Sequence, residues 1–381
     1  MVHTSDWHVG KLLRGASRLE EHKAVLAEIA EVADERRADL VLVVGDLYET
    51  AAPSPEATAV VYDALLALRE TGAHVVVVGG NHDQQSQLDA VAPLFDRVGV
   101  TVLGLPTTPD RAVVDVAGAR VAMLPWMSQR WAVKTEQLMG ATAAATVQFY
   151  AARVARVLAW ITESFATDTV NIVAAHCMVQ GGTLGGGERD AQLIDSYAIP
   201  TAAFPASANY VALGHLHRAQ RMQGAAPIWY SGSPIQVDFG EEHDTKQILV
   251  VDIPDRGAAK VMPVPLTRGA VLRTVRGTLS ELEAAAAVAG AGAGDAYLRV
   301  FVREQPRAGL ADDVRALLPS AVDVRIAPDA KPEPGAHSPS APATRSSVPR
   351  ELFHQYLDGI GHAADVRLAA LFDELLDAET V

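Results

Sequence analysis

The sequence predicts an α/β protein with a largely buried sheet, followed by a small α+β unit and a pair of C-terminal helices. In the first two thirds of the chain, short apolar runs alternate with segments of helical periodicity, as is typical of α/β domains. Each of these runs ends in an aspartate, asparagine or histidine, which places polar side chains at one edge of the predicted sheet. The first observation predicts the fold, and the second predicts where its chemistry lies.

The strands of the first unit are expected at its apolar runs, and a helix lies between the first two. The runs cover residues 40–44, 75–78, 172–175 and 210–213, and two closing strands are expected near 228–230 and 247–253. The helix is expected over 54–69, because Ser54 can cap it and Pro55 suits its first turn. Gly72 can end the same helix.

Two more helices are expected to cover this sheet. Ser17 and Glu20 have the spacing of a capping box, which predicts a helix from there to about residue 38. A longer helical stretch covers about 141–165. These elements together predict a first domain over residues 1–265.

A smaller unit over residues 266–328 follows. Its strands are expected at 272–275, 297–302 and 322–326, with helices at 279–288 and 310–317 between them. This βαβαβ pattern holds none of the candidate site residues, so we interpret the unit as a small α+β cap domain.

The C-terminal part of the chain is predicted to be a flexible linker and a helical pair. Residues 329–348 are rich in Pro, Ala and Ser, which is typical of a linker. Residues 349–381 carry two apolar stripes, one of them including Leu352 and Phe353, the other Leu371 and Phe372. A short helical pair cannot bury such stripes by itself, so we expect it to dock on the parent domain or on a partner.

Composition and charge exclude several classes of protein. The chain has no run of 18 apolar residues and no signal-peptide pattern, so we expect a cytoplasmic protein rather than a membrane or secreted one. Cys177 is the single cysteine, and we expect a buried thiol there rather than a zinc ligand. The net charge of −14 argues against holding nucleic acid by bulk electrostatics, but it does not exclude a nuclease that uses bound cations.

Seven side chains at the strand ends form a candidate metal site: Asp6, His8, Asp46, Asn81, His176, His215 and His217. Mixed imidazole and oxygen donors suit Mn²⁺, Fe²⁺ or Zn²⁺ better than Mg²⁺. Seven donors are too many for one ion, whereas two ions that share Asp46 would use them all. Two ions about 3.5–4 Å apart can activate a phosphate ester for in-line attack. Glycines 45, 80 and 214 precede the ligands and would permit tight turns.

The order of these motifs resembles that of the calcineurin-like metallophosphoesterases. The motifs are Asp6-Trp7-His8, Gly45-Asp46, Gly80-Asn81-His82-Asp83, His176 and Gly214-His215-Leu216-His217. Three further stretches, at 3–10, 230–241 and 349–353, resemble the narrower SbcD family of bacterial nuclease subunits. The resemblance implies a β-sandwich flanked by helices.

The resemblance also implies roles for single residues. Asp6, His8, Asp46 and His217 would hold one metal, and Asp46, Asn81, His176 and His215 would hold the other. His82 would be the catalytic histidine, since a leaving oxygen needs a proton and an imidazole can supply it. The alternative for His82 is to orient the substrate phosphate. Asp83 would hold a histidine or a loop. Glu49 departs from the family pattern, since some relatives carry a histidine at this position, and its carboxylate could orient His82 or a metal-bound water.

The function implied by the resemblance is a manganese-dependent DNA nuclease that works with an SbcC-like ATPase. It would act as a 3′–5′ double-strand exonuclease and a single-strand or hairpin endonuclease, as a homodimer, with residues 349–381 docked on SbcC. Two alternatives remain: a small-molecule or cyclic-nucleotide phosphodiesterase, and a non-catalytic scaffold for SbcC. Lys11, Arg14 and Arg18 could contact the DNA backbone or form an ordinary solvated helix entry.

Overall fold

The structure is a computed structural model. It describes residues 1–128, 143–186, 197–254, 259–289, 296–328, 368 and 371–372. The chain divides into two compact units, Met1–Ala330 and Lys331–Val381. Apart from Leu368, Leu371 and Phe372, the predicted linker and C-terminal helical pair lie outside the described residues. None of the described helices combines the length and apolar character needed to cross a membrane.

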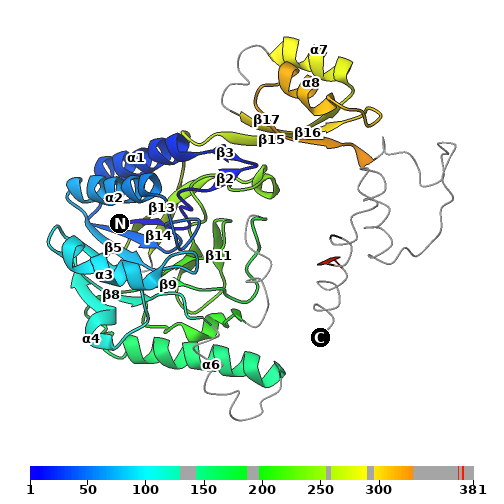
Figure 1. Ribbon diagram of the computed structural model, residues 1–381. Coiled ribbons are helices and arrows are strands. Elements are labelled where there is room, and N and C mark those ends of the chain that lie inside the picture. Colours follow the sequence, from blue (N-terminus) through cyan, green and yellow to red (C-terminus); the bar gives the residue numbers. More distant parts are fainter. Residues whose placement is uncertain are drawn as a thin grey trace. The chain divides into compact units, whose positions relative to one another are not determined.

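The first sheet has six strands in the order β14-β13-β1-β4-β5-β6. Its strands are β1 (Val2–Thr4), β4 (Leu40–Val44), β5 (His74–Val78), β6 (Val100–Leu103), β13 (Gln247–Asp252) and β14 (Lys260–Pro265). Strands β1, β4, β5 and β6 are parallel to one another, and β13 pairs antiparallel with β1. Three helices pack against this sheet: α1 (Leu19–Glu35), α2 (Pro55–Glu70) and α3 (Gln85–Asp96) (Figure 1).

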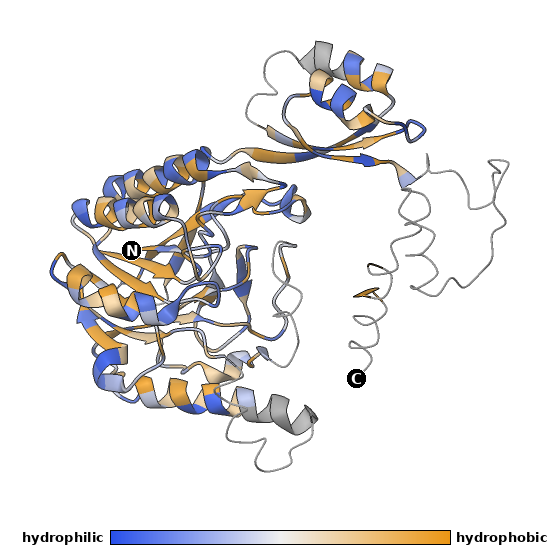
Figure 2. Ribbon diagram, in the orientation of Figure 1, coloured by the Kyte–Doolittle hydropathy of each residue, from blue (hydrophilic) through white to orange (hydrophobic). Residues whose placement is uncertain are grey.

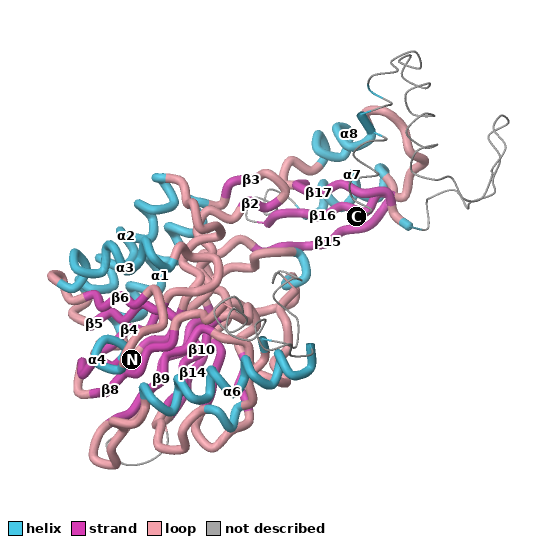
Figure 3. The backbone as a smooth tube through the Cα atoms, turned by 60° about the horizontal axis from the view of Figure 1, so that its bottom comes forward, coloured by secondary structure: helices cyan, strands magenta, loops and turns pink. Residues whose placement is uncertain are grey.

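The second sheet also has six strands, in the order β11-β12-β10-β9-β8-β7. They are β7 (Val113–Val116), β8 (Ala119–Leu124), β9 (Val170–His176), β10 (Tyr210–Gly214), β11 (Gln220–Met222) and β12 (Ile228–Tyr230), with the short α4 (Pro109–Ala112) before β7. Helix α6 (Ala143–Ile161) packs on this sheet through Tyr150, Val154 and Leu158. The strands therefore lie between α1–α3 and α6 (Figure 3).

Alternation along β4 explains why the two sheets pack face to face. Leu42 and Val44 belong to the same buried cluster as the second sheet, whereas Val41 and Val43 pack with residues of α1 and α2. All five residues of β4 are buried, and Figure 2 shows this run and its neighbours as hydrophobic strands. Burial on both faces is typical of parallel strands covered on both sides. The predicted β-sandwich flanked by helices is confirmed.

A third sheet follows in the order β15-β16-β17, with both pairs parallel. Its elements are β15 (Val271–Gly277), α7 (Leu279–Ala289), β16 (Ala296–Val302), α8 (Leu310–Leu317) and β17 (Ala321–Ile326), which is the expected βαβαβ order. Leu282, Val300 and Val314 lie in a separate hydrophobic cluster that joins the helices to the sheet. The small unit therefore has its own core.

The start of α1 differs from the prediction. No capping box forms, because Arg18 is the N-cap residue and no side chain caps the helix. Ser17 instead belongs to β3 (Ala16–Ser17), which pairs with β2 (Leu12–Leu13) in a small hairpin. In contrast, Ser54 caps α2 as predicted, with its hydroxyl accepting from the Ala57 amide at 3.2 Å.

Candidate metal centre

All seven residues predicted as ligands lie together where the strands of the two sheets end. The first sheet supplies four of them through the segments that follow β1, β4 and β5, and the second supplies three through β9 and the segment after β10. Two groups, Asp6–His8–His217 and Asp46–His176–His215, each have their ligand atoms within 4.8 Å of one another. Asn81 adjoins the second group, with its Oδ1 2.9 Å from His176 Nε2 and from His215 Nδ1.

Asp46 lies between the two groups. Its Oδ2 is 3.4 Å from His176 Nε2 and 3.8 Å from His8 Nε2. Its Oδ1 accepts a hydrogen bond from the His82 amide at 2.8 Å. Burial alone would raise the pKa of Asp46, but the neighbouring His176 lowers it well below its ordinary value. An ionised carboxylate in this position is suited to bridging two cations.

The donor set fits two divalent metal ions. His8 Nε2 and His215 Nε2 are buried and have no hydrogen-bond partner among the described residues. Buried polar atoms without partners are rare, because leaving them unpaired is costly. Burial lowers the pKa of His8 to about 4 and that of His215 to about 3, which keeps both imidazoles in the neutral form that binds metal.

Backbone strain is concentrated at these ligands. Asp6, His8 and Asp46 have φ angles of 53°, 48° and 52°, and His215 has a φ of 112°. Residues other than glycine rarely occupy this left-handed region, and such strain often marks functional sites. The Asp6 amide donates to the carbonyl of Gly45 at 2.9 Å, so the two strained turns hold each other in place.

Two of the predicted turn glycines leave room for ligands. A Cβ atom on Gly45 would lie 2.0 Å from His176 Nδ1, and one on Gly80 would lie 2.1 Å from Asp46 Oδ1. Gly45 also has a φ of +84°, as expected for a tight turn, whereas Gly80 does not have a positive φ. Close approach of a ligand is therefore the reason for glycine at position 80.

Hydrogen bonds to the second ring nitrogen orient three of the histidines. His8 Nδ1 lies 3.0 Å from Glu49 Oε2, and His217 Nδ1 lies 2.9 Å from Glu241 Oε1. His176 Nδ1 donates to the carbonyl of Val44 at 2.9 Å. Such partners fix the ring and direct its other nitrogen toward a metal.

Glu49 orients His8 through its side chain and His82 through its backbone carbonyl. Its carboxylate accepts from His8 and, at 2.9 Å, from Lys11, while its backbone carbonyl accepts from His82 Nδ1 at 2.8 Å. Burial would raise the pKa of Glu49, but the hydrogen bonds from His8 and Lys11 lower it to about 2. His8, Glu49 and His82 form a third group of potential ligand atoms, but the Glu49 carboxylate is already bonded on both oxygens.

Asp83 holds loops rather than a histidine. Its carboxylate accepts from the amides of Tyr48 at 3.1 Å and Gly80 at 2.8 Å. Burial and the nearby Asp46 raise the pKa of Asp83 to about 7. The segments after β4 and β5, which carry Asp46 and Asn81, are thereby tied together.

Trp126 is a site residue that the sequence pattern did not reveal. It follows the end of β8, and its ring stacks on His215 with centroids 4.9 Å apart at 25°. Because β8 pairs parallel with β9, the strand-end reasoning that found His176 also applies to Trp126. An indole is not a metal ligand, so a search for metal donors does not select it.

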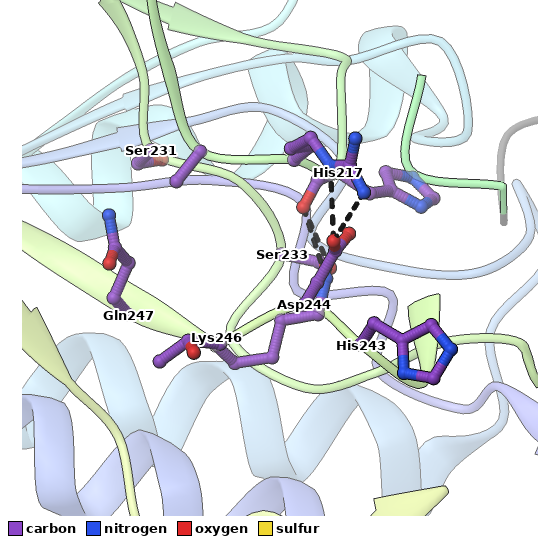
Figure 4. Close-up of a pocket in the computed structure, with 10 residues that line it drawn as sticks. His217, Ser231, Ser233, His243, Asp244, Lys246 and Gln247 are labelled. Atoms are coloured by element: carbon purple, nitrogen blue, oxygen red, sulfur yellow. Dashed lines mark hydrogen bonds and ion pairs between the residues drawn. The ribbon is translucent and has the colours of Figure 1, made fainter. Parts of the chain in front are cut away.

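Glu241 was also missed, and it lies behind His217. The side chain of Glu241 is fully buried and pairs with Lys246 at 2.7 Å. Lys246 also donates to the His217 carbonyl at 3.1 Å and to Ser233 at 2.9 Å, as Figure 4 shows (Figure 4). A cavity of about 230 Å³ opens beside these residues. No short spacing in the sequence connects positions 217 and 241, so only the fold reveals this pair.

The three basic residues after the first motif are engaged within the protein. Arg18 is buried against Glu21, so neither alternative, a contact with a DNA backbone or a solvated helix entry, holds for this residue. Arg14 pairs with Asp238 at 3.3 Å and Lys11 pairs with Glu49. These ion pairs link neighbouring segments of the chain.

Comparisons with known proteins agree with this arrangement. The family model described as calcineurin-like phosphoesterase matches residues 1–219. The SbcD subunit of the SbcCD nuclease of Bacillus subtilis strain 168 is 34% identical over 276 residues, which cover 71% of this chain and 70% of that protein. The proteins of the same name from Rhodobacter capsulatus and from Escherichia coli K12 are 33% and 27% identical, over 70% and 74% of this chain and 69% and 72% of theirs.

Proposed function

The chain belongs to the calcineurin-like phosphoesterase family and, within it, to the family of SbcD nuclease subunits, and from this premise we propose that it is a metal-dependent DNA nuclease. The observation that carries the proposal is the convergence of seven donors, with two buried imidazole nitrogens left without partners among the described residues, at the shared edge of two sheets. We assign Asp6, His8, Asp46 and His217 to one ion and Asp46, Asn81, His176 and His215 to the other. Divalent cations bound there, Mn²⁺ first among them, supply Lewis-acid activation of a phosphodiester.

His82 is the residue that we propose for proton transfer. Its Nδ1 is held by the Glu49 carbonyl, which leaves Nε2 as the atom that exchanges a proton with substrate. The Glu49 carboxylate lies 3.9 Å from the same ring. In this role His82 donates a proton to the sugar oxygen that leaves when the DNA chain is cut.

The proposed partner follows from the names of the relatives. Each relative is one subunit of the nuclease SbcCD, so we propose that this chain also works with an SbcC-like ATPase, in the cytoplasm on nucleoid DNA. We further propose 3′–5′ digestion of duplex ends, opening of hairpins, and a homodimer of the subunit. The boundaries at 265, 328 and 348 remain our proposal for its domain organisation, with residues 349–381 as the segment that binds SbcC.

A nuclease assay tests the proposal. Wild type, His82→Ala and Asp46→Ala are incubated with a blunt DNA duplex and Mn²⁺, with and without an SbcC-like ATPase and ATP. We expect cleavage by wild type and a loss of about a hundredfold or more in both variants, as is common for general acids and metal ligands. Absence of cleavage by wild type under every condition would favour the scaffold alternative. Full activity of Asp46→Ala would contradict the shared bridge.

A further inference from the structure

We propose that residues 236–242 couple the three-stranded sheet β15–β17 to the metal ligand His217. In this view the contacts between that sheet and the segment set the affinity of the Asp6–His8–His217 group for its ion. They leave the affinity of the Asp46–His176–His215 group unaffected. The inference rests on the proposed metal centre. It adds a route of regulation, because a movement of the sheet would change the affinity for one ion only.

One end of the path is the contact between Glu241 and His217. Glu241 Oε1 lies 2.9 Å from His217 Nδ1, and its other oxygen accepts from the Val237 amide at 3.0 Å. The side chain is fully buried, so no water competes for these bonds. The orientation of the His217 ring is therefore determined by where the backbone places Glu241.

The other end of the path is a set of contacts from the same segment to the small sheet. Phe239 is buried in a cluster with Leu272 of β15, and the guanidinium of Arg299 on β16 lies 4.3 Å from its ring centroid. Gln236 accepts from the Leu272 amide at 2.7 Å, and Glu242 accepts from Thr274 at 2.6 Å. Residues on both sides of Glu241 are thus bonded to β15 or β16.

A cluster of ion pairs reinforces this attachment. Asp238 lies 3.3 Å from Arg14 and 3.7 Å from Arg299. Asp323 on β17 lies 3.2 Å and 2.9 Å from the same two arginines. The side chains of Arg299 and Asp323 are only 16% and 10% exposed, so solvent screens their attraction less than it would at the surface.

The segment between the two ends is too short and too constrained to absorb a movement. Phe239–Glu241 is a single 3-10 turn, in which the Glu241 amide donates to the Asp238 carbonyl at 2.9 Å. Phe239 is held by the small sheet, and Glu241 holds the metal ligand two residues later. A shift of Phe239 would therefore act on Glu241, which contacts His217 and is held on its other oxygen by Lys246 at 2.7 Å.

The test compares metal binding by two full-length variants. Thr274→Val with Arg299→Gln removes contacts to residues 236–242 without altering that segment or any ligand. Arg315→Gln is the matched control, since it removes one positive charge from α8 of the same small unit and its side chain bonds to Asp312. Mn²⁺ binding is followed by calorimetry and by electron paramagnetic resonance, and the selective loss is read from the two dissociation constants.

We expect the double variant to weaken Mn²⁺ binding at the Asp6–His8–His217 site by about threefold to tenfold. Glu241→Gln deletes the direct partner of His217, so it should weaken binding at the same site by the tenfold to hundredfold typical of such partners. The other site and the Arg315→Gln control should stay within about twofold of wild type. If the double variant does not fold, Thr274→Val alone should give the same selective direction.

Three results would overturn the coupling: equal weakening of both sites, an effect of Arg315→Gln as large as that of the double variant, or no change at either site. A wild type that binds two ions but cuts no DNA would contradict the proposed nuclease function alone, because the binding data still decide the coupling. A wild type that binds no divalent ion would overturn both.

Discussion

Replacing Glu49 with glutamine should weaken one of the two metal sites and leave the other unchanged. Glu49 holds His8 at 3.0 Å and Lys11 at 2.9 Å, and its pKa is lowered from 4.5 to about 2. Among the partners that lower this pKa, His8 has the larger effect and Lys11 the smaller. Loss of the carboxylate leaves the His8 ring without the partner that orients it, so we expect roughly tenfold weaker binding of the ion at Asp6–His8–His217, at the lower end of the range for second partners of metal-bound histidines.

The measurement is a two-site Mn²⁺ titration of the full-length protein, with Lys11→Met as the matched control. Lys11→Met removes the other partner of Glu49 and leaves the bond to His8 in place, so both dissociation constants should stay within about twofold of wild type. The reasoning would be refuted if Glu49→Gln weakened both sites equally, or if it changed neither while Lys11→Met changed one.

Three further predictions concern other parts of the fold. Gly80→Ala would bring a Cβ atom to 2.1 Å from Asp46 Oδ1, so we expect it to displace the shared carboxylate and reduce nuclease activity at least tenfold. Wild-type activity in this variant would show that glycine is not required at position 80 for the close approach of Asp46. Cys177 is 3% exposed and burial raises the pKa of its thiol to about 12, so iodoacetamide at pH 8 should label it only after unfolding; rapid labelling of the native protein would contradict this burial. Burial lowers the pKa of His3 from 6.5 to about 3, so the unfolded chain binds more protons between these values and stability is lost as pH falls below 6.5. Urea titrations at pH 7 and pH 5 measure how much unfolding free energy each protein loses on acidification. This loss should be about 2 kcal/mol smaller in His3→Gln than in wild type, and equal losses would show that His3 is not responsible.

The fold was predictable from the sequence where an apolar run is uninterrupted, whereas β6 and β8 are largely buried and were not predicted. The run Leu40–Val44 is buried along its whole length and became β4 with the predicted bounds. The strand Val113–Val116 was not predicted, because it contains Asp115 and only partly buried valines, so its sequence has no clear apolar run. The capping-box spacing at Ser17 was misleading because β3 uses that residue in a hairpin.

The candidate site was predictable to the extent that its residues follow strands. Asp46 and His176 come directly after or at the end of apolar runs, and parallel strands bring such positions to one edge of a sheet. The partners behind the ligands were not predictable in the same way. Glu241 reaches His217 from a separate turn, and the role of Glu49 depends on where the loop after β4 places its carboxylate and its carbonyl.

The strained backbone at the ligands was also invisible in the sequence. Asp6, His8 and Asp46 carry positive φ angles without being glycine. Local preference disfavours each of them, and crossed hydrogen bonds between the segments after β1 and β4 help to hold them in place, including His8 N to Asp46 O at 3.0 Å. Functional sites are where local sequence preference and global structure are expected to disagree.

The central claim is that these seven residues hold two ions that share Asp46, and anomalous X-ray diffraction from crystals soaked in Mn²⁺ tests it most directly. The account predicts two anomalous peaks about 3.5–4 Å apart, one contacting His8 and His217, the other contacting His176 and His215, with Asp46 bound to both. A single peak, or two peaks that do not share Asp46, would contradict it.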